Sequence, residues 1–301
     1  MKKPLASLLL LSSLVTPATT IADETTLPKE FQGFTWNSKV TLSYDDLDAL
    51  LEATVLDVGL SDRSSAKSSS TIGTRMRSHK NKDSAFEANR FMFEELKNSP
   101  VKDAFHDIRV SLENVPSEIS LSELKNDEQL AYWLNLYNVA LLEKLIQAYP
   151  IYDMEDELIG DSSILNEKFL TVAGHSLSLN DVQHIVFEKF GDKPVVMYGF
   201  YQGNIGSPSL NPDPFTGDKV YHQLEYRAEE FINSNRGVVP EKRKTLKVSK
   251  FYEQANTLFE DFDKDLKDHL IVFADSSIKY DIKNAKRIEP EIENWSINDI
   301  Y

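Results

Sequence analysis

The segment from Glu128 to Tyr149 is the feature of this chain that most restricts its fold. From Ala131 to Leu142 nearly every side of the segment is apolar, so as a helix it must be surrounded by the rest of the domain. Pro150 cannot continue the helix and disfavours helical geometry at the residue before it. Its apolar residues recur at the three- and four-residue steps of an α-helix, at Leu130, Trp133, Leu134, Tyr137, Leu141, Leu145 and Ala148.

Two amides, Asn135 and Asn138, interrupt this apolar segment and lie on one face of the predicted helix. A buried amide is unfavourable unless it is hydrogen-bonded. The pair therefore has two interpretations. Either the amides tie the helix to neighbouring backbone, or they orient a bound ligand.

The rest of the chain predicts an α+β fold, a single mainly helical domain over residues 41–301 around a small sheet. An extended lead over residues 23–40 precedes the domain. Ser178 and Asp181 have the spacing of a capping box, and Gly191 would end the helix that they begin. Helical spacing also appears at 41–60, 84–112 and 216–232, the last with Thr216 as its cap. Short strands are predicted at 169–172, 176–179 and, as a buried apolar run, 195–201.

The first 22 residues have the three-part layout of a secretory signal peptide. Lys2 and Lys3 are followed by an apolar run from Leu5 to Val15 and by small residues before Asp23. No later run is long enough to cross a bilayer, so we expect the mature chain to be periplasmic or secreted, with no integral membrane segment. Cysteine is absent, which excludes disulfides, thiol chemistry and zinc–thiolate sites.

The chain is strongly acidic, with a formal charge of −15. Removing residues 1–22 removes two lysines and no acid, which makes the charge of the mature chain −17. Such a chain repels nucleic acids and anionic membrane surfaces. Residues 61–83 are basic and form either a solvated loop or an anion-contacting flap. No phosphate-binding glycine loop and no histidine pair at metal-ligand spacing occurs, so we predict no cofactor and no metal.

The stretch Ala131–Asn138 reads Ala-Tyr-Trp-Leu-Asn-Leu-Tyr-Asn. This octapeptide resembles the signature of a family known as domain of unknown function 547, with the pattern AYWxNxYN. Other stretches resemble the family in the same order, at Val172–Gly174 with Ser178–His184, Lys219–Ile232, Val248–Phe251 with Asp261-Phe262, and Trp295–Asn298. The resemblance covers about residues 120–299. With export expected from residues 1–22, the chain resembles an exported, bacterial-type member of that family, and the family name supplies no chemistry.

Two departures from that family bear on catalysis. Relatives commonly carry a histidine and a cysteine where this chain has Met197 and Ser207. A histidine and a cysteine there would be a plausible base and nucleophile, whereas Met197 cannot move protons and Ser207 needs a base. If the family is hydrolytic, this chain has lost or rebuilt the site.

Two functions remain open from the sequence. We favour a non-catalytic exported binding or accessory protein, with an unidentified ligand or protein partner held by Asn135, Asn138, Tyr198 and Tyr201. The alternative is a hydrolase or transferase in which His184 and Asp181 form an acid/base pair, possibly with Ser207. Loops at strand ends commonly carry sites, so we predict that 202–214 borders the main pocket, with His184 and Tyr198 or Tyr201 within reach.

Overall fold

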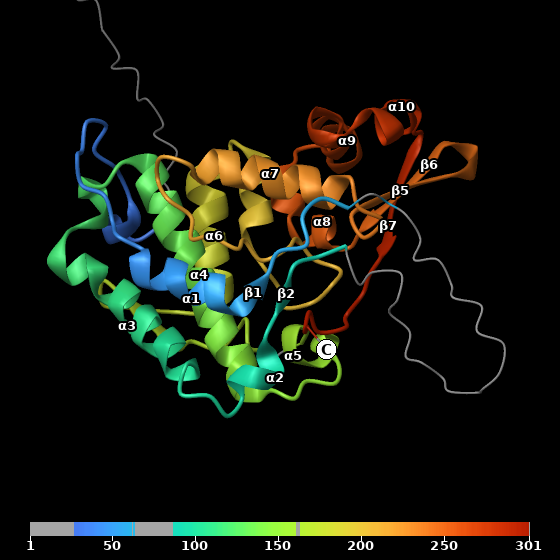
Figure 1. The fold of residues 1–301 in the computed structure, drawn as a ribbon. Coiled ribbons are helices and arrows are strands. Elements are labelled where there is room, and N and C mark those ends of the chain that lie inside the picture. The colour runs from blue at the N-terminus through green and yellow to red at the C-terminus, as the bar shows by residue number, and fades with distance from the viewer. Residues whose placement is uncertain (1–26, 62, 64–86, 161–162, 301) are drawn as a thin grey trace, which may run out of the picture.

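The computed structural model describes residues 27–61, 63, 87–160 and 163–300 (Figure 1). The predicted signal peptide and nearly all of the basic stretch 61–83 lie outside the described residues. Within the part of the chain that is described, no helix is both long enough and apolar enough to cross a membrane.

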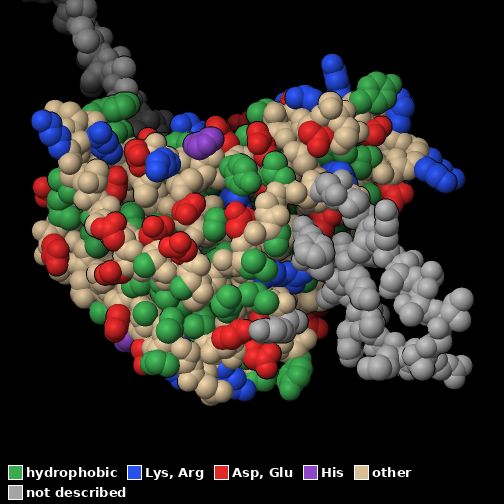
Figure 2. Space-filling model, in the orientation of Figure 1, with side chains coloured by type: hydrophobic (Ala, Val, Ile, Leu, Met, Phe, Trp, Pro, Cys, Tyr) green, Lys and Arg blue, Asp and Glu red, His purple; other side chains and the backbone are tan. Residues whose placement is uncertain are grey.

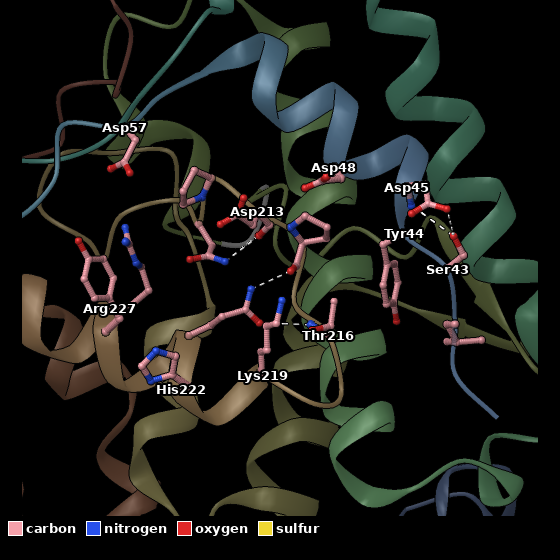
Figure 3. Close-up of a pocket in the computed structure, with 16 residues that line it drawn as sticks. Ser43, Tyr44, Asp45, Asp48, Asp57, Asp213, Thr216, Lys219, His222 and Arg227 are labelled. Atoms are coloured by element: carbon pink, nitrogen blue, oxygen red, sulfur yellow. Dashed lines mark hydrogen bonds between the residues drawn. The ribbon is translucent and has the colours of Figure 1, made fainter. Parts of the chain in front are cut away.

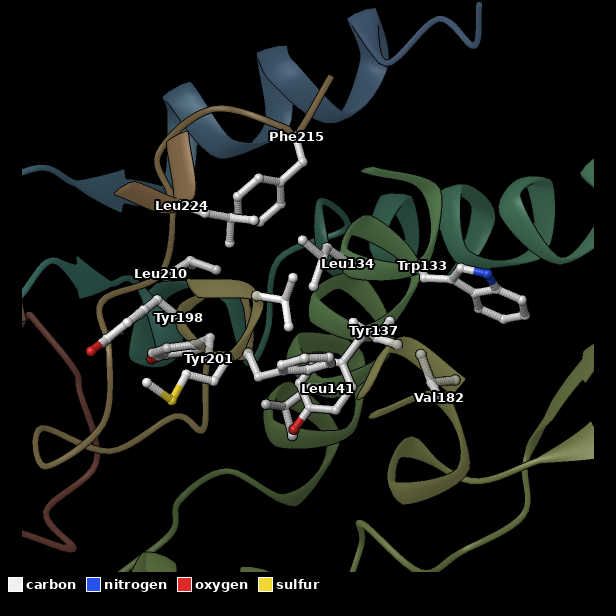
Figure 4. Close-up of a cluster of buried hydrophobic side chains, with 14 of the residues drawn as sticks. Trp133, Leu134, Tyr137, Leu141, Val182, Tyr198, Tyr201, Leu210, Phe215 and Leu224 are labelled. Atoms are coloured by element: carbon white, nitrogen blue, oxygen red, sulfur yellow. The ribbon is translucent and has the colours of Figure 1, made fainter. Parts of the chain in front are cut away.

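The fold is built around helix α4 (Asn126–Ala148), which confirms the predicted central helix. Helices α3 (Lys102–Glu118), α6 (Leu179–Phe190) and α7 (Val220–Ile232) pack against it. Side chains of α4 meet those of α6, α7 and the 198–215 region in one apolar core (Figure 4). Phe31 of the N-terminal lead belongs to the same core and packs edge-on against Trp133 of α4, with ring centroids 5.1 Å apart.

In the described residues helices predominate and the strands form three small sheets, so the predicted mainly helical α+β class is confirmed. β1 (Val55–Leu56) pairs with β2 (Arg90–Phe91), and β3 (Leu170–Val172) pairs with β4 (His175–Leu177), both antiparallel. In the third sheet β6 (Thr245–Ser249) lies between antiparallel β5 (Val238–Glu241) and parallel β7 (Arg287–Ile292). This sheet forms a lobe with α8 (Phe251–Gln254), α9 (Phe262–Phe273) and α10 (Ser276–Asn284), to the right in Figure 1.

The prediction of a strand at 195–201 is wrong. Residues Pro194–Gly199 form a 3₁₀ helix, η3, which packs against α6 and α7. A short apolar run buried on every side is equally compatible with a strand and with a buried helical turn, so its pattern does not separate them. Pro194 favours the helical start, and Gly199 lies so close to α4 that a Cβ there would come within 2.7 Å of the Leu134 side chain.

Several helix boundaries also differ from the predictions. The helix expected over 84–112 is interrupted, because β2 and the short α2 (Phe93–Leu96) precede α3. Thr216 does not cap α7, which begins at Val220 with Lys219 at the N-cap, and the Thr216 hydroxyl donates instead to Asp218 Oδ1 (2.6 Å).

Helix α1 (Asp45–Thr54) lies inside the predicted range 41–60, and α5 (Met154–Leu158) was not predicted. The remaining 3₁₀ turns are η1 (Lys29–Phe31), η2 (Leu121–Glu123), η4 (Lys242–Lys244) and η5 (Asn256–Leu258).

Charged side chains of both signs are spread over the face seen in Figure 2. Lysine and arginine side chains lie at the upper left and also project at the upper right, where the β5–β6 hairpin ends. The residues of that turn are Lys242, Arg243 and Lys244, all exposed. They form a second basic stretch besides 61–83.

Candidate functional site

A cleft of about 900 Å³ lies between α1 and α7, and we call it the α1–α7 cleft (Figure 3). Three segments form its walls: the start of α1, one face of α7, and the loop that joins η3 to α7. A volume of this size suits a small-molecule ligand. The lining residues are Leu42, Ser43, Tyr44, Asp45, Asp48, Asp57, Asn211, Pro212, Asp213, Pro214, Thr216, Lys219, His222, Gln223, Tyr226 and Arg227.

The two helical walls carry different charges. On the α7 side the cleft is lined by the N-cap residue Lys219 and by residues that recur at helical spacing, and Lys219 and Arg227 carry the positive charge of this wall. The α1 wall carries Asp45 and Asp48, which Figure 3 shows on the first turns of α1. A ligand in the cleft therefore meets a cationic wall and an acidic wall.

The loop wall is fixed to the core by side-chain amides. Asn135 of α4 donates to the Phe215 carbonyl (2.8 Å) and accepts from the Phe215 N–H (2.9 Å). Gln223 of α7 donates to the Pro214 carbonyl (2.8 Å) and accepts from the Thr216 N–H (3.2 Å). Because the NH₂ group and the oxygen of each side-chain amide both bond the loop backbone, the loop is held in one position without a ligand.

The α1 wall is also attached to α4. The Leu42 N–H, just before α1, donates to Glu128 Oε1 (2.9 Å). Gly217 packs so closely on the start of α4 that a Cβ there would come within 2.9 Å of the Glu128 Cα. Burial raises the pKa of Glu128, and the nearby Asp218 acts in the same direction, although the Leu42 N–H opposes them. The cleft is thus framed by contacts with the central helix on both sides.

Arg227 is the most unusual group in the cleft. Its side chain is only 2% exposed, yet Nε and Nη1 have no hydrogen-bond partner among the described residues. The guanidinium lies over the ring of Tyr226, 4.6 Å from its centroid. Burial lowers the pKa of Arg227, while the carboxylates of Glu230 and Asp57 act against that shift. An arginine stays protonated in this setting, so the cleft wall contains a buried cation.

Asn138, the second amide of α4, is buried and does not line this cleft. It donates to the Gly199 carbonyl (2.9 Å) and accepts from the Tyr201 N–H (3.2 Å). Asn135 and Asn138 both border a much smaller cavity, of about 10 Å³, which shares Asn211 and Asp213 with the lining of the cleft. The contacts of both amides are those of the first interpretation, in which they tie α4 to neighbouring backbone.

His184 and Asp181 are not hydrogen-bonded to each other. Asp181 caps α6 by accepting from the Ser178 N–H (2.7 Å) and hydroxyl (2.8 Å), so the predicted capping box is confirmed. Partial burial opposes ionisation of Asp181, but these bonds and nearby Lys168 lower its pKa. The exposed His184 pairs instead with Glu188, with 3.2 Å between Nε2 and Oε2.

Ser207 is buried, at 1% exposure, and its hydroxyl donates to the Asn204 carbonyl (3.0 Å) within its own loop. The loop is held from inside by Arg236, a residue that no sequence pattern indicated. The Arg236 guanidinium donates to the carbonyls of Glu87 and Ser207, to Ser209 Oγ and to the Glu230 carboxylate.

Tyr198 and Tyr201 lie in the core, at 1% and 2% exposure. Tyr198 stacks on His269, with ring centroids 5.7 Å apart, and its hydroxyl lies 3.1 Å from His269 Nε2. Neither tyrosine lines the α1–α7 cleft, and neither do His184 and Ser207. The prediction for the loop 202–214 holds in part, because its end, Asn211–Pro214, forms a wall of the cleft.

A second cluster missed from the sequence borders a cleft of about 530 Å³ between α3 and α4. His106 Nδ1 lies 2.9 Å from Glu143 Oε1, and Arg109 Nε donates to the other carboxylate oxygen. Burial opposes ionisation of Glu143, but the bonds from Arg109 and His106 lower its pKa. This network joins α3 to α4.

Residues 121–232 match the model of a family described as "Protein of unknown function, DUF547". The matched segment contains α4, α6 and α7, with the loop wall and the α7 wall of the cleft, but not α1. The match supports the resemblance seen in Ala131–Asn138. Comparisons with curated proteins and with solved structures gave no significant match. In the described residues no group of three or more His, Asp or Glu side chains is arranged to hold a metal ion.

Proposed function

We propose that the protein is an exported, non-catalytic binding or accessory protein whose ligand occupies the α1–α7 cleft. The observation that carries this proposal is the separation of the candidate catalytic groups from the cleft. Ser207 Oγ is directed into its own loop, and His184 pairs with Glu188 on α6. A serine nucleophile needs a base within hydrogen-bond reach, and among the described residues the Ser207 hydroxyl contacts only backbone carbonyls.

The cleft itself has the properties of a binding site. Its loop wall is held by Asn135 and Gln223, and its α1 wall is attached through Leu42 and Glu128. Walls that are fixed before a ligand arrives lower the entropy cost of binding. The layout of residues 1–22 supports export to the periplasm or the medium, and the match over residues 121–232 supports the family of unknown function, of which the chain would be an exported, bacterial-type member.

A hydrolase or transferase is the second candidate. It is favoured by the His184–Glu188 contact, because a carboxylate that orients a histidine is common in acid/base catalysis. In this candidate Asp181 would act through its charge, and Ser207 would have to leave its buried position.

One set of variants separates the two candidates. The mature chain is screened with small polar molecules by thermal shift, and hits are measured by calorimetry. We expect His222→Trp, which fills the cleft without removing a hydrogen bond, to abolish binding, and His184→Ala to leave it unchanged. Hydrolytic activity that is lost in His184→Ala, or binding that is unchanged in His222→Trp, would contradict the proposal.

Export is tested separately. We expect the full-length chain, expressed in a bacterium, to be recovered outside the cytoplasm with Asp23 as its first residue. Intact mass measurement gives the new terminus. Recovery of the uncut chain from the cytoplasm would contradict the export proposal without affecting the cleft.

A further inference from the structure

Arg227 has no paired carboxylate among the described residues. Arg227, Glu230 and Arg236 are respectively 2%, 1% and 5% exposed, and the Glu230 carboxylate is paired with Arg236. The other buried carboxylate of this region, Glu87, accepts the Asn235 N–H and lies beside Arg236, which donates to the Glu87 carbonyl. Removing a charge from water without a partner is strongly unfavourable, so the Arg227 guanidinium favours a negatively charged partner.

The other groups that face Arg227 do not supply that charge. Asp57 influences Arg227 electrostatically but forms no ion pair with it within 4.0 Å, and its Oδ1 accepts the Gly59 N–H (3.0 Å). Tyr226 offers only the face of its ring. Figure 3 shows Arg227 extending from α7 toward the side of the cleft where Asp57 lies. Two guanidinium nitrogens, Nε and Nη1, therefore remain without a partner among the described residues.

We propose that Arg227 binds the oxyanion, carboxylate or phosphate, of a small ligand in the α1–α7 cleft. This inference rests on the proposed function, and it adds the chemical class of the ligand. A guanidinium is suited to the role because its planar donors match the two oxygens of a carboxylate or phosphate.

The acidic wall restricts the rest of the ligand. Asp45 and Asp48 of α1 line the cleft and, with Asp213 of the loop wall, repel a second negative charge, whereas Asp57 lies on the side of Arg227. A cationic group on the ligand is attracted to the same carboxylates. The preferred ligand is therefore a zwitterion, with its oxyanion at Arg227 and its cationic group toward α1.

The first test needs no ligand. Arg227→Met removes a buried, uncompensated charge and keeps much of the side-chain volume, so we expect an unchanged or higher melting temperature. Lys219→Met, on the same wall but exposed, is the matched control and should change the melting temperature little. A melting temperature several degrees lower for Arg227→Met would show that the guanidinium is structural, and would overturn the inference.

The second test uses three probes at constant ionic strength: acetate, inorganic phosphate and phosphoethanolamine. We expect at least one oxyanion to raise the melting temperature of the wild type relative to chloride, and phosphoethanolamine to bind more tightly than phosphate. Acetate and phosphate distinguish the two oxyanions. Arg227→Met should weaken binding by about tenfold to a hundredfold, the usual worth of a hydrogen bond to a charged group. Tighter binding of phosphate than of phosphoethanolamine would overturn the role of the acidic wall.

Failure of this inference differs from failure of the proposed function. Binding that is blocked by His222→Trp but is equal in wild type and Arg227→Met would refute the role of Arg227 and leave the cleft as the site. Binding that is unaffected by His222→Trp would refute the cleft itself. No response of the wild type to any of the three probes would overturn the oxyanion inference.

Discussion

Replacing Asn138 by leucine tests how the central helix is held in the core. The Asn138 amide accepts from the Tyr201 N–H and donates to the Gly199 carbonyl, at the end of η3. Leucine keeps a similar volume but leaves both backbone groups without their partner. Each orphaned buried donor or acceptor costs about 1–3 kcal/mol, and the apolar area that leucine adds offsets part of the combined cost of the two groups. We therefore expect Asn138→Leu to lose about 2–4 kcal/mol of folding free energy.

That loss is large against the total stability of a domain, about 5–15 kcal/mol. Urea unfolding followed by tryptophan fluorescence measures it, provided that the slope of the transition is unchanged. The matched control is Leu136→Met on the same buried helix, which conserves volume and should cost less than about 1.5 kcal/mol. If Asn138→Leu were as stable as the wild type, the two hydrogen bonds would not be what retains the amide in the core.

Three further changes have defined outcomes. Burial lowers the pKa of His269 to about 4, from an ordinary 6.5, so the unfolded chain binds the proton first as pH falls. The free energy of unfolding should thus decline between pH 6.5 and 4, by up to about 3 kcal/mol. Urea titrations at several pH values should show a smaller decline in His269→Phe. Ser178→Ala removes one half of the α6 capping box and should cost about 1 kcal/mol of unfolding free energy, whereas no loss would mean that Asp181 caps alone. Arg236→Met leaves buried Glu230 unpaired and should cost about 3–5 kcal/mol in the same assay, so a neutral result would refute the role of this ion pair.

The sequence predicted those elements whose signal is local. Helix α4 follows from an apolar pattern that covers all its sides, and α6 follows from Ser178 and Asp181 at its start. The run 195–201 was misassigned because complete burial removes the alternation that distinguishes a strand from a helix. Thr216 has the residue type of a helix cap, but its hydroxyl is used by Asp218, two residues further on.

The candidate site could be predicted only in part, because its walls come from distant segments. The loop wall was predicted from glycine, proline and asparagine after an apolar run. The α1 wall was not, since nothing in residues 43–48 indicates that they face α7. Arg227 did leave a signal: it falls on the α7 face that otherwise holds Val220, Leu224 and Phe231. A charged residue among such positions indicates either a buried ion pair or a site, and sequence alone does not say which.

Arg227 and Arg236 show how the structure distinguishes a buried ion pair from a binding site. Arg236 donates to three backbone carbonyls, to Ser209 and to Glu230, so all its contacts are internal and hold the loop 202–210. Arg227 is equally buried but has two nitrogens without partners. The same substitution by methionine should therefore change stability in opposite directions, with a loss at Arg236 and no loss or a gain at Arg227. Removing a structural guanidinium breaks compensated contacts, whereas removing one that awaits a ligand removes an unfavourable charge. A loss of similar size at both positions would mean that Arg227 is compensated within the fold, and the cleft would then lack its oxyanion site.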